Sequence, residues 1–226
     1  MTTTQTGAVA VVVGANRGIG LALCRQLQAR GRTVIAAART PSPEMTALGV
    51  RVETGVEVTA DASVAAFARR LEGISIAELW CVAGILREDT LATLSFDEIR
   101  EQVEVNALGP LRVVKALVGQ LGAGSKIGLM TSRMGSIGDN GSGGEYGYRM
   151  SKAALNAAGM SLARDLRASE IAVAILHPGY VRTDMTGGGG NLTPEESARL
   201  LVDRVDGLTL ATSGTFWHAN GQVLPW

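Results

Sequence analysis

The sequence predicts an α/β fold in which a doubly wound, parallel sheet of seven strands carries helices on both faces. Two observations predict it. Short continuous runs of small and β-branched apolar residues, such as residues 8–13, are typical of strands that are buried on both faces. These runs alternate along the chain with segments of helical periodicity, and such alternation is typical of parallel sheets with crossover helices.

The expected elements follow one another without an internal repeat or a dividing linker, so we expect a single domain over residues 1–226. The predicted strands span residues 8–13, 33–38, 50–58, 78–82, 126–131, 171–176 and 214–218. The predicted helices span residues 19–31, 62–71, 95–121 and 148–167, and a last helix begins after Thr193.

A glycine-rich turn joins the first strand to the first helix. Gly14, Gly18 and Gly20 have the spacing G-x-x-x-G-x-G. Glycines between a strand and a helix let backbone N–H groups approach a phosphate at the positive end of the helix dipole. The spacing differs from the commoner G-x-G-x-x-G, so it indicates a Rossmann-like phosphate site only loosely.

Arg39 stands at the end of the second predicted strand, where a dinucleotide-binding unit holds the adenosine ribose. An acidic residue there would bind the ribose 2′-hydroxyl, whereas an arginine would bind a 2′-phosphate. No carboxylate stands at this strand end, and Arg17 lies just before Gly18. We therefore expect Arg39 and Arg17 to favour NADP(H). The alternative is two exposed arginines that contribute only about 0–1 kcal/mol.

The long helical pattern over residues 95–121 contains a proline. Ser95 and Glu98 fit a capping box at its start. Pro110 has no N–H to offer the carbonyl four residues earlier, which belongs to Asn106. We expect a kink that exposes the polar Asn106, and the kink is either functional or a harmless bend in a long helix.

Tyr148 and Lys152 lie four residues apart and therefore share one face of a helix. An ammonium about 4 Å from a phenol, at an effective dielectric of about 20, stabilises the phenolate by roughly 4 kcal/mol. That is enough to bring the pKa of a tyrosine from about 10 to near 7. A bare Y-x-x-x-K is more often a solvated helix face. Ser132, at the end of the fifth predicted strand, favours an acid–base site instead.

Two later segments carry local signals. Residues 187–190 are four consecutive glycines that cannot hold one conformation by themselves, and they form either a mobile flap or a surface connector. Thr193 with Glu196 three residues later fits a capping box that has Pro194 at the first helical position. The carboxylates of Glu195 and Glu196 are therefore interpreted as capping groups.

Composition limits the class of partner. Lys plus Arg equals Asp plus Glu, 21 against 21, which disfavours binding to nucleic acid or to an anionic membrane surface. The first residues lack a basic signal segment and no apolar run is long enough to span a bilayer, so we expect a cytoplasmic protein. Two cysteines, Cys24 and Cys81, and two histidines indicate buried side chains without a disulfide or a metal site.

Taken together, these motifs resemble the classical short-chain dehydrogenase/reductase family over nearly the whole chain. Four separated motifs agree in order and spacing: Gly14-x-x-x-Gly18-Ile19-Gly20, Asn106 in V-N-A-L-G-P, Ser132 to Tyr148-x-x-x-Lys152, and Pro178-Gly179-x-x-x-Thr183. The segment Y-R-x-S-K-x-A-L-N and the closing L-P-W look like the branch that contains the C-factor and sniffer-type carbonyl reductases.

The resemblance implies an NADP(H)-dependent oxidoreductase that interconverts a small carbonyl compound and an alcohol, and a homodimer or homotetramer that pairs through the helix after Tyr148. It implies a catalytic set of Asn106, Ser132, Tyr148 and Lys152, with a water on the freed carbonyl of Asn106 passing protons to Lys152. The implied cofactor-binding residues are Gly14, Asn16, Arg17, Gly18, Ile19, Gly20, Arg39, Glu57, Val58, Ala83, Gly84, Tyr148, Lys152, Pro178, Gly179, Val181 and Thr183.

The chain departs from the family pattern at three places. Cys81-Val82-Ala83-Gly84 stands where the family has N-N-A-G, and Glu57 stands where an Asp usually meets the adenine amine. Ser132 lies sixteen residues before Tyr148 because the intervening loop is lengthened. Ser136 is therefore an alternative to Ser132. We prefer Ser132 because the S-x-x-G pattern that begins there matches the family pattern.

A function of another class is a cofactor-binding signalling or scaffold protein with little turnover, since a fold alone does not specify activity. Such a protein needs the glycine turn and Arg39 but no catalytic side chains. The presence of all four catalytic residue types favours the enzyme.

Overall fold

A computed structural model describes residues 7–226. Its seven strands form one sheet in the order β3-β2-β1-β4-β5-β6-β7, and every neighbouring pair is parallel. The strands are β1 Val9–Val13, β2 Thr33–Ala37, β3 Arg51–Glu53, β4 Ile76–Cys81, β5 Leu121–Met130, β6 Ala172–His177 and β7 Phe216–His218. The predicted doubly wound α/β fold is confirmed.

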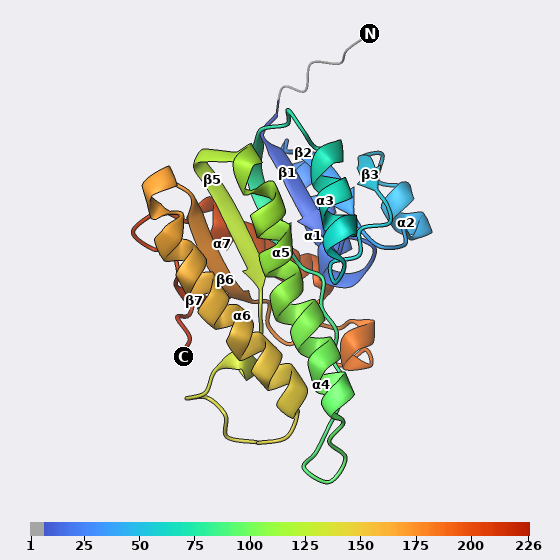
Figure 1. The fold of residues 1–226 in the computed structure, drawn as a ribbon, viewed down its shortest axis with the longest axis vertical. Coiled ribbons are helices and arrows are strands. Elements are labelled where there is room, and N and C mark those ends of the chain that lie inside the picture. Colours follow the sequence, from blue (N-terminus) through green and yellow to red (C-terminus); the bar gives the residue numbers. More distant parts are fainter. Residues whose placement is uncertain (1–6) are drawn as a thin grey trace.

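Helices cover both faces of this sheet, as Figure 1 shows. They are α1 Gly18–Ala29, α2 Pro43–Thr46, α3 Asp61–Arg70, α4 Phe96–Val103, α5 Gly109–Leu117, α6 Tyr146–Asp165 and α7 Pro194–Asp206. The apolar residues of α1 and α7 form one buried core against the sheet, and those of α3, α5 and α6 form a second core on the other face. Strands buried on both faces explain the continuous apolar runs of the sequence.

Two predicted strand boundaries were wrong. The third strand ends at Glu53 instead of residue 58, because Gly55 has φ +68° and turns the chain out of the extended conformation. The fifth strand begins at Leu121, which pairs with Ile76, although the helix was expected to run that far. The local sequence there is rich in glycine and small residues, so the sheet pairing and not the helical pattern decides its structure.

The interrupted helix divides into three parts. A π-helical turn, Glu104–Leu108, joins α4 to α5, and the N–H of Gly109 bonds to the carbonyl of Glu104, five residues back. Pro110 is the second residue of α5. Because its missing N–H breaks the regular ladder at Asn106, the chain adopts the wider turn that is common at functional sites.

The helix caps agree only in part with the sequence. Thr193 and Glu196 form the predicted reciprocal capping box. The Ser95 hydroxyl accepts the N–H of Glu98 at 3.3 Å, but within residues 7–226 the Glu98 side chain returns no bond, so only half of that box forms. The short helix α2, capped by Ser42, was not predicted.

The run of four glycines makes hydrogen bonds with the residues around it. The N–H of Gly188 donates to Thr183 O at 2.9 Å, and the Thr186 hydroxyl lies 2.7 Å from Gly189 O and 2.8 Å from Val181 O. A Cβ on Gly190 would lie 2.6 Å from the nitrogen of Arg182. Gly190 therefore serves close backbone packing, whereas Gly187 and Gly188 serve the left-handed backbone, with φ of +58° and +82°.

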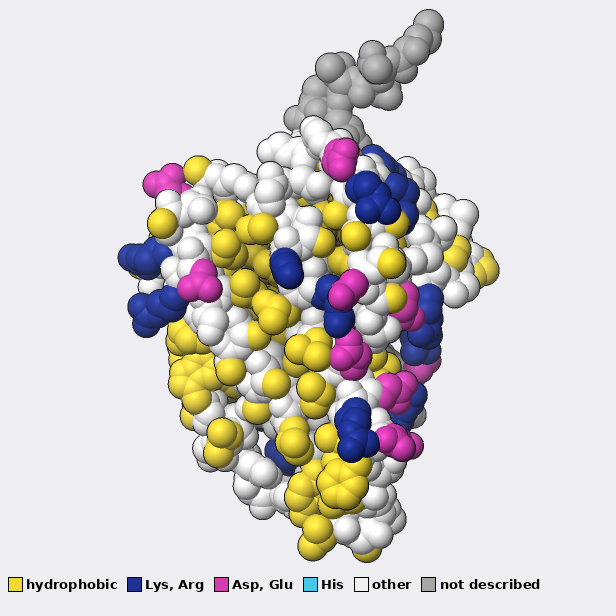
Figure 2. Space-filling model, in the orientation of Figure 1, with side chains coloured by type: hydrophobic (Ala, Val, Ile, Leu, Met, Phe, Trp, Pro, Cys, Tyr) yellow, Lys and Arg dark blue, Asp and Glu magenta, His cyan; other side chains and the backbone are white. Residues whose placement is uncertain are grey.

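Charged and apolar side chains are separated over the surface. Figure 2 shows apolar side chains over much of the face that α5 and α6 present, with charged groups gathered mainly toward the edges. Within residues 7–226 no helix combines the length and the apolarity that crossing a membrane requires.

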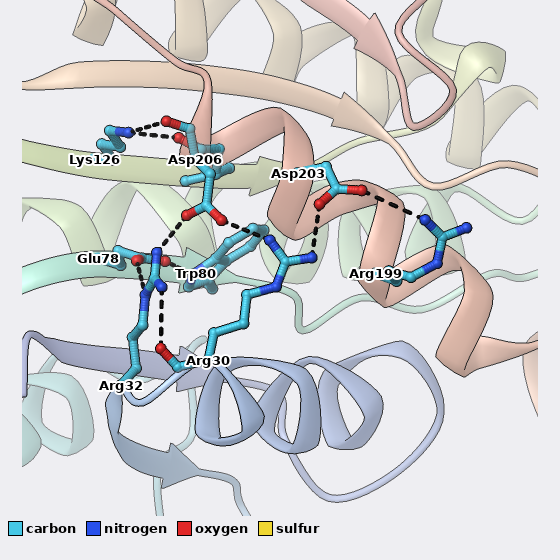
Figure 3. A network of polar contacts seen from close by, with 9 residues as sticks. Arg30, Arg32, Glu78, Trp80, Lys126, Arg199, Asp203 and Asp206 are labelled. Atoms are coloured by element: carbon cyan, nitrogen blue, oxygen red, sulfur yellow. Dashed lines mark hydrogen bonds and ion pairs between the residues drawn. The ribbon is translucent and has the colours of Figure 1, made fainter.

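A polar network fixes the end of α7 against the sheet, away from the carboxyl ends of the strands (Figure 3). Arg30 pairs with Asp203 and Asp206 at 2.6 Å, and Arg32 pairs with Asp206 and, at 2.9 Å, with the buried Glu78. The indole of Trp80 donates to the second oxygen of Glu78, and Lys126 donates to the last carbonyls of α7. A cation at a helix C-terminus is favourable, so the network orients the helix whose first residue lines the site.

Candidate active site

A cavity of about 610 Å³ lies along the carboxyl ends of the strands, on the side where open parallel sheets bind ligands. Residues at the ends of five strands, or directly after them, line it: Val13, Ala38, Val82, Met130 and Pro178. It spans the position where the strand order reverses, between β1 and β4. The order and direction of the strands therefore determine where the cavity lies, independently of its side chains.

The glycine turn forms one wall of this cavity. Gly14 has φ +96° and Gly18 has φ +50°, conformations that disfavour other residues. A Cβ on Gly14 would overlap the backbone nitrogen of Ala83, and a Cβ on Gly18 would lie 3.4 Å from a methyl carbon of Thr183. The turn thus packs tightly against the segment after β4 and leaves its backbone open to a ligand.

The start of α1 suits an anion. Its N-cap residue, Arg17, makes no side-chain hydrogen bond to the helix, and the first turn holds no acidic residue. Gly18, Ile19 and Gly20, which begin the helix, line the cavity. Free N–H groups at the positive end of a helix bind phosphate, so the pyrophosphate of a dinucleotide fits this wall.

Both predicted arginines lie at the cavity, but each has a carboxylate partner. Arg39 Nη1 lies 3.1 Å from Glu57 Oε2, and Arg17 Nη1 lies 2.9 Å from Asp184 Oδ2. The expectation that no carboxylate meets Arg39 was therefore wrong. Glu57 comes from the segment after β3, and pairing of β2 with β3 brings it beside the end of β2. Both ion pairs are exposed, so each is worth only about 0–1 kcal/mol.

The catalytic candidates gather at the other part of the cavity. Tyr148 and Lys152 line it from α6, and the Lys152 Nζ lies 5.6 Å from the centre of the Tyr148 ring. Lys152 Nζ donates to Met130 O at 2.9 Å. The Ser132 hydroxyl acts on Tyr148 from just after β5 and opposes the rise that burial causes in the pKa of its phenol. The structure therefore brings together the three side chains that the sequence placed on a strand end and a helix.

The pKa values of this group correct the sequence argument. Burial raises the pKa of Tyr148 to about 12, and the Ser132 hydroxyl opposes this only in part. Burial also lowers the pKa of Lys152 to about 8. The chain by itself therefore does not bring Tyr148 near neutrality as expected, because removal from water disfavours both the phenolate and the ammonium that would stabilise it.

Asn106 is fully buried, which overturns the expectation that the kink exposes it. Its side-chain amide donates to Ile85 O at 2.8 Å and to Ser151 Oγ at 2.9 Å, and its oxygen accepts the N–H of Ile85 at 2.8 Å. Ser151 in turn donates to Tyr148 O at 2.7 Å. The segment after β4 and helix α6 cover the π turn, so the Asn106 side chain ties them together.

Most of the predicted cofactor residues line the cavity, and the exceptions are Gly179 and Val181. Gly179 is buried with φ +90°, and Val181 is buried in a bridge to Leu192. Of the catalytic set, Asn106 and Ser132 are not among the residues that line the cavity. The predicted residues that do line it are Gly14, Asn16, Arg17, Gly18, Ile19, Gly20, Arg39, Glu57, Val58, Ala83, Gly84, Tyr148, Lys152, Pro178 and Thr183.

Sequence reasoning missed a buried pair that supports the serine turn. Thr131 Oγ1 donates to Asn156 Oδ1 at 2.7 Å, and Asn156 Nδ2 donates to Gly135 O at 3.2 Å. Asn156 lies one turn after Lys152 on the same helix face, and that spacing is the signal that would have found it. A Cβ on Gly135 would lie 2.7 Å from the Lys152 backbone, so the turn after Ser132 packs directly on α6.

Several loop residues at the cavity were also missed. Arg87 lines it and pairs at 3.1 Å with Glu101 of α4, which also lines it, and Arg182 and Asp184 line it from the segment after β6. Loop residues follow no helical or strand periodicity, so only the assembled structure identifies them.

A glycine-walled cavity at the topological switch point, with a phenol and an amine at one end and arginines at the other, defines an oxidoreductase of the dinucleotide-binding class. A family model described as short chain dehydrogenase matches residues 8–190. The chain belongs to the short-chain dehydrogenase family.

Known relatives agree with this assignment. The chain is 45% identical over 222 residues to 1-hydroxy-2-glutathionyl-2-methyl-3-butene dehydrogenase of Rhodococcus sp. (strain AD45), covering 96% of this chain and 98% of the relative. It is 39% identical over 158 residues to C-signal of Myxococcus xanthus, covering 69% and 90%. The NADPH-bound carbonyl reductase from chicken fatty liver superposes with a TM-score of 0.88 at 30% identity, covering 97% and 98%.

Proposed function

We propose that this chain is an NADP(H)-dependent carbonyl reductase that can also run the reverse alcohol oxidation, with Tyr148 as its acid–base residue. The observation that carries the proposal is the placement of Tyr148 and Lys152 in one cavity with the uncapped start of α1. A nicotinamide cofactor bound there supplies hydride to a carbonyl carbon or accepts it from an alcohol.

Tyr148 acts as the proton donor to the carbonyl oxygen. A phenol whose pKa is about 12 keeps its proton at neutral pH, so it is in the protonation state that reduction requires. Ser132 acts on the Tyr148 phenol and can hold the same substrate oxygen. Lys152, with a pKa near 8, is mainly cationic at neutral pH and stabilises the phenolate once the proton has left.

Asn106 supports proton exchange through its backbone. Its side chain forms hydrogen bonds with Ile85 and Ser151. The group that holds a water is therefore its backbone carbonyl, which Pro110 leaves without the usual helical N–H partner. A Cβ on Gly84 would lie 3.1 Å from Asn106 Oδ1 and 3.5 Å from Lys152 Nζ. A side chain at Gly84 would therefore crowd both groups.

Arg39 and Arg17 select the phosphorylated cofactor. A 2′-phosphate competes with the Glu57 carboxylate for Arg39, and it does so with more charge and more acceptor oxygens. An exposed ion pair of about 0–1 kcal/mol is weaker than hydrogen bonds to charged groups of about 1.5–3 kcal/mol. The chicken carbonyl reductase of the same fold is bound to NADPH.

The Rhodococcus relative suggests one substrate, an alcohol that carries a glutathionyl group. Its identity of 45% extends over 96% of this chain, so a glutathione-conjugated alcohol belongs in the assay beside simple carbonyls. Its name describes a dehydrogenase, which favours oxidation as the physiological direction. A signalling role is the second candidate, because C-signal is 39% identical, but a signalling role does not require the Tyr148–Lys152 pair.

We further propose a single catalytic domain over residues 1–226 that acts in the cytoplasm as a homodimer or homotetramer. One sheet with a continuous order of seven strands supports the single domain. Exposed apolar residues on the π turn, α5 and α6 support self-association: Leu108, Leu111 and Met150.

The decisive experiment compares Tyr148→Phe with Tyr146→Phe, an exposed tyrosine of the same helix. NADPH oxidation is followed with aldehydes, ketones and diketones, and the reverse reaction with the glutathione-conjugated alcohol. We expect Tyr148→Phe to lower turnover by about 10²–10⁴-fold while NADPH affinity, measured by fluorescence titration, stays nearly unchanged. Retained activity in Tyr148→Phe, or equal loss in Tyr146→Phe, contradicts the proposal.

A further inference from the structure

The chain between β4 and α4 crosses the site in an extended path that side chains hold at alternate residues. Ile85 exchanges two hydrogen bonds with the Asn106 amide, each 2.8 Å long. Arg87 does the same with the buried Gln102 amide, at 3.0 Å and 3.4 Å. Gln102 and Asn106 lie one helical turn apart, so two side-chain amides pair with this segment as a neighbouring strand would.

The third anchored residue of this path is Asp89, and it bonds to the helix that carries Tyr148. Its Oδ1 accepts the N–H of Tyr146 at 2.6 Å, and its Oδ2 accepts the N–H of Gly147 at 3.1 Å. Its backbone carbonyl accepts the N–H of Glu145 at 3.0 Å. Three consecutive N–H groups at the start of α6 therefore end on one residue, which is only 5% exposed.

Local sequence does not supply this cap. The N-cap residue of α6 is Glu145, which has φ 52° and makes no side-chain hydrogen bond to the helix. A helix start usually has Ser, Thr, Asp or Asn in an extended conformation at that place. The first turn of α6 thus depends on a carboxylate that comes from 57 residues earlier in the chain.

We propose that Asp89 is a positioning residue, which holds the first turn of α6 so that Tyr148 meets the substrate oxygen. This inference rests on the proposed carbonyl reduction. Tyr148 is the third residue of α6 and moves with that turn, whereas Lys152 has its own bond to Met130 in β5. Loosening the turn therefore changes the position of the phenol relative to the ammonium.

The same carboxylate joins the helix to the segment at the cavity. Ile85 and Arg87 line the cavity, and Asp89 connects their segment to Tyr146 and Gly147. The glycine turn and the start of α1 lie on other elements, so the cofactor wall does not depend on Asp89. Loss of Asp89 should therefore lower kcat and leave cofactor affinity intact.

The test compares Asp89→Asn and Asp89→Ala with Asp97→Asn. Asp97 also lies in the first turn of a helix, but its side chain is exposed and, among residues 7–226, pairs only with Arg100. We expect Asp89→Asn to lower kcat at least about tenfold, since small misplacements of a catalytic group have effects of that order. Asp89→Ala should lower kcat further, whereas Asp97→Asn should change kcat less than about twofold. In all three variants the Kd for NADPH should change less than about twofold.

Amide hydrogen exchange of residues 145–147 provides a readout that does not need turnover. Asp89→Asn should accelerate exchange at these amides, and Asp97→Asn should not. If Asp89→Asn folds poorly, Glu145→Gly is added to relieve the left-handed backbone, and the loss of kcat should persist in the double variant. If the wild-type protein is active, unchanged amide exchange or unchanged kcat in Asp89→Asn overturns the proposal for Asp89. A wild-type protein that reduces no carbonyl overturns the proposed function instead.

Discussion

The two serines that the lengthened loop left as alternatives differ in their contacts. Ser132 acts on Tyr148 and opposes the rise that burial causes in the pKa of its phenol, and the Ser132 hydroxyl accepts the N–H of Met134 at 3.2 Å. Ser136 is buried, and its hydroxyl accepts the N–H of Asp139 at 3.1 Å, which fixes the following loop. The contacts favour Ser132 as the residue that holds the substrate oxygen.

We predict that Ser132→Ala lowers kcat by roughly 10²-fold or more, as removal of one oxyanion donor commonly does. Ser136→Ala is the matched control and should lower kcat less than about tenfold, because only a loop contact is lost. Steady-state kinetics with the best carbonyl substrate measures both. A larger effect at Ser136 would show that the loop presents the other hydroxyl.

Arg39 is the residue at which cofactor choice is decided. We predict a preference for NADPH over NADH of at least about tenfold in kcat/KM, equivalent to roughly 1.4 kcal/mol, which weakens as salt rises. Arg39→Asp should reverse the preference, because it places a second carboxylate beside Glu57.

Glu57→Gln sharpens this test. It removes the carboxylate that competes for Arg39, so we expect it to increase the preference for NADPH. Arg25→Asp is the control, since Arg25 pairs with Glu195 and does not line the cavity. Equal use of both cofactors by the wild-type protein at low salt would show that Arg39 does not meet the ribose.

At the scale of the elements, the ends of β6 and β7 bring the two histidines together. His177 pairs with His218 in the strand register, and their rings meet edge to face at 4.8 Å. The buried Nδ1 of His177 has no hydrogen-bond partner within residues 7–226. Burial and the positive charge of Arg133 lower the pKa of both histidines. Burial, with the charges of His218 and Arg133, lowers the pKa of His177 from 6.5 to about 3.

This shift has a definite sign for stability. Between pH 6.5 and 3 the unfolded chain binds a proton at His177 that the folded chain does not, so stability is lost as the pH falls. We predict that Tm drops between about pH 7.5 and pH 5, and that His177→Gln reduces this drop. Differential scanning calorimetry of both proteins measures it. An equal drop in the variant would assign the acid sensitivity to other groups.

On the scale of the whole molecule, two exposed apolar stripes lie on the same face of the sheet. Leu108, at the end of the π turn, and Leu111 of α5 mark one stripe, and Met150, Ala154 and Ala157 follow a helical spacing on α6. Figure 2 shows apolar side chains over the face that these helices present. Small residues permit close approach of helices, so a second copy of the chain fits this face.

We predict that Ala154→Glu converts the protein to a monomer, because it places a charge in the centre of the helix pair. Ile137→Glu, which changes an exposed apolar residue of the loop after β5, should leave the assembly unchanged. Sedimentation equilibrium measures the mass of each protein. A monomeric wild-type protein would contradict the proposed homo-oligomer.

Local sequence was sufficient for the features that one segment decides. The alternation of buried strands and helices predicted the sheet, and the glycine spacing predicted a tight turn, because hydrophobic periodicity and backbone freedom are properties of neighbouring residues. The pairing of Tyr148 with Lys152 followed from helical spacing alone. The missing N–H of Pro110 located the break at Asn106, although not its π turn.

Only the tertiary structure decided which groups meet from distant segments. Glu57 reaches Arg39 because β3 pairs with β2, and Asn106 is buried because α6 and the segment after β4 cover it. The pKa of Tyr148 rises because folding removes the phenol from water, and the four-residue spacing of Tyr148 and Lys152 gives no information about this desolvation. Asp89 caps α6 from 57 residues away, and no local pattern predicts a cap supplied across the fold.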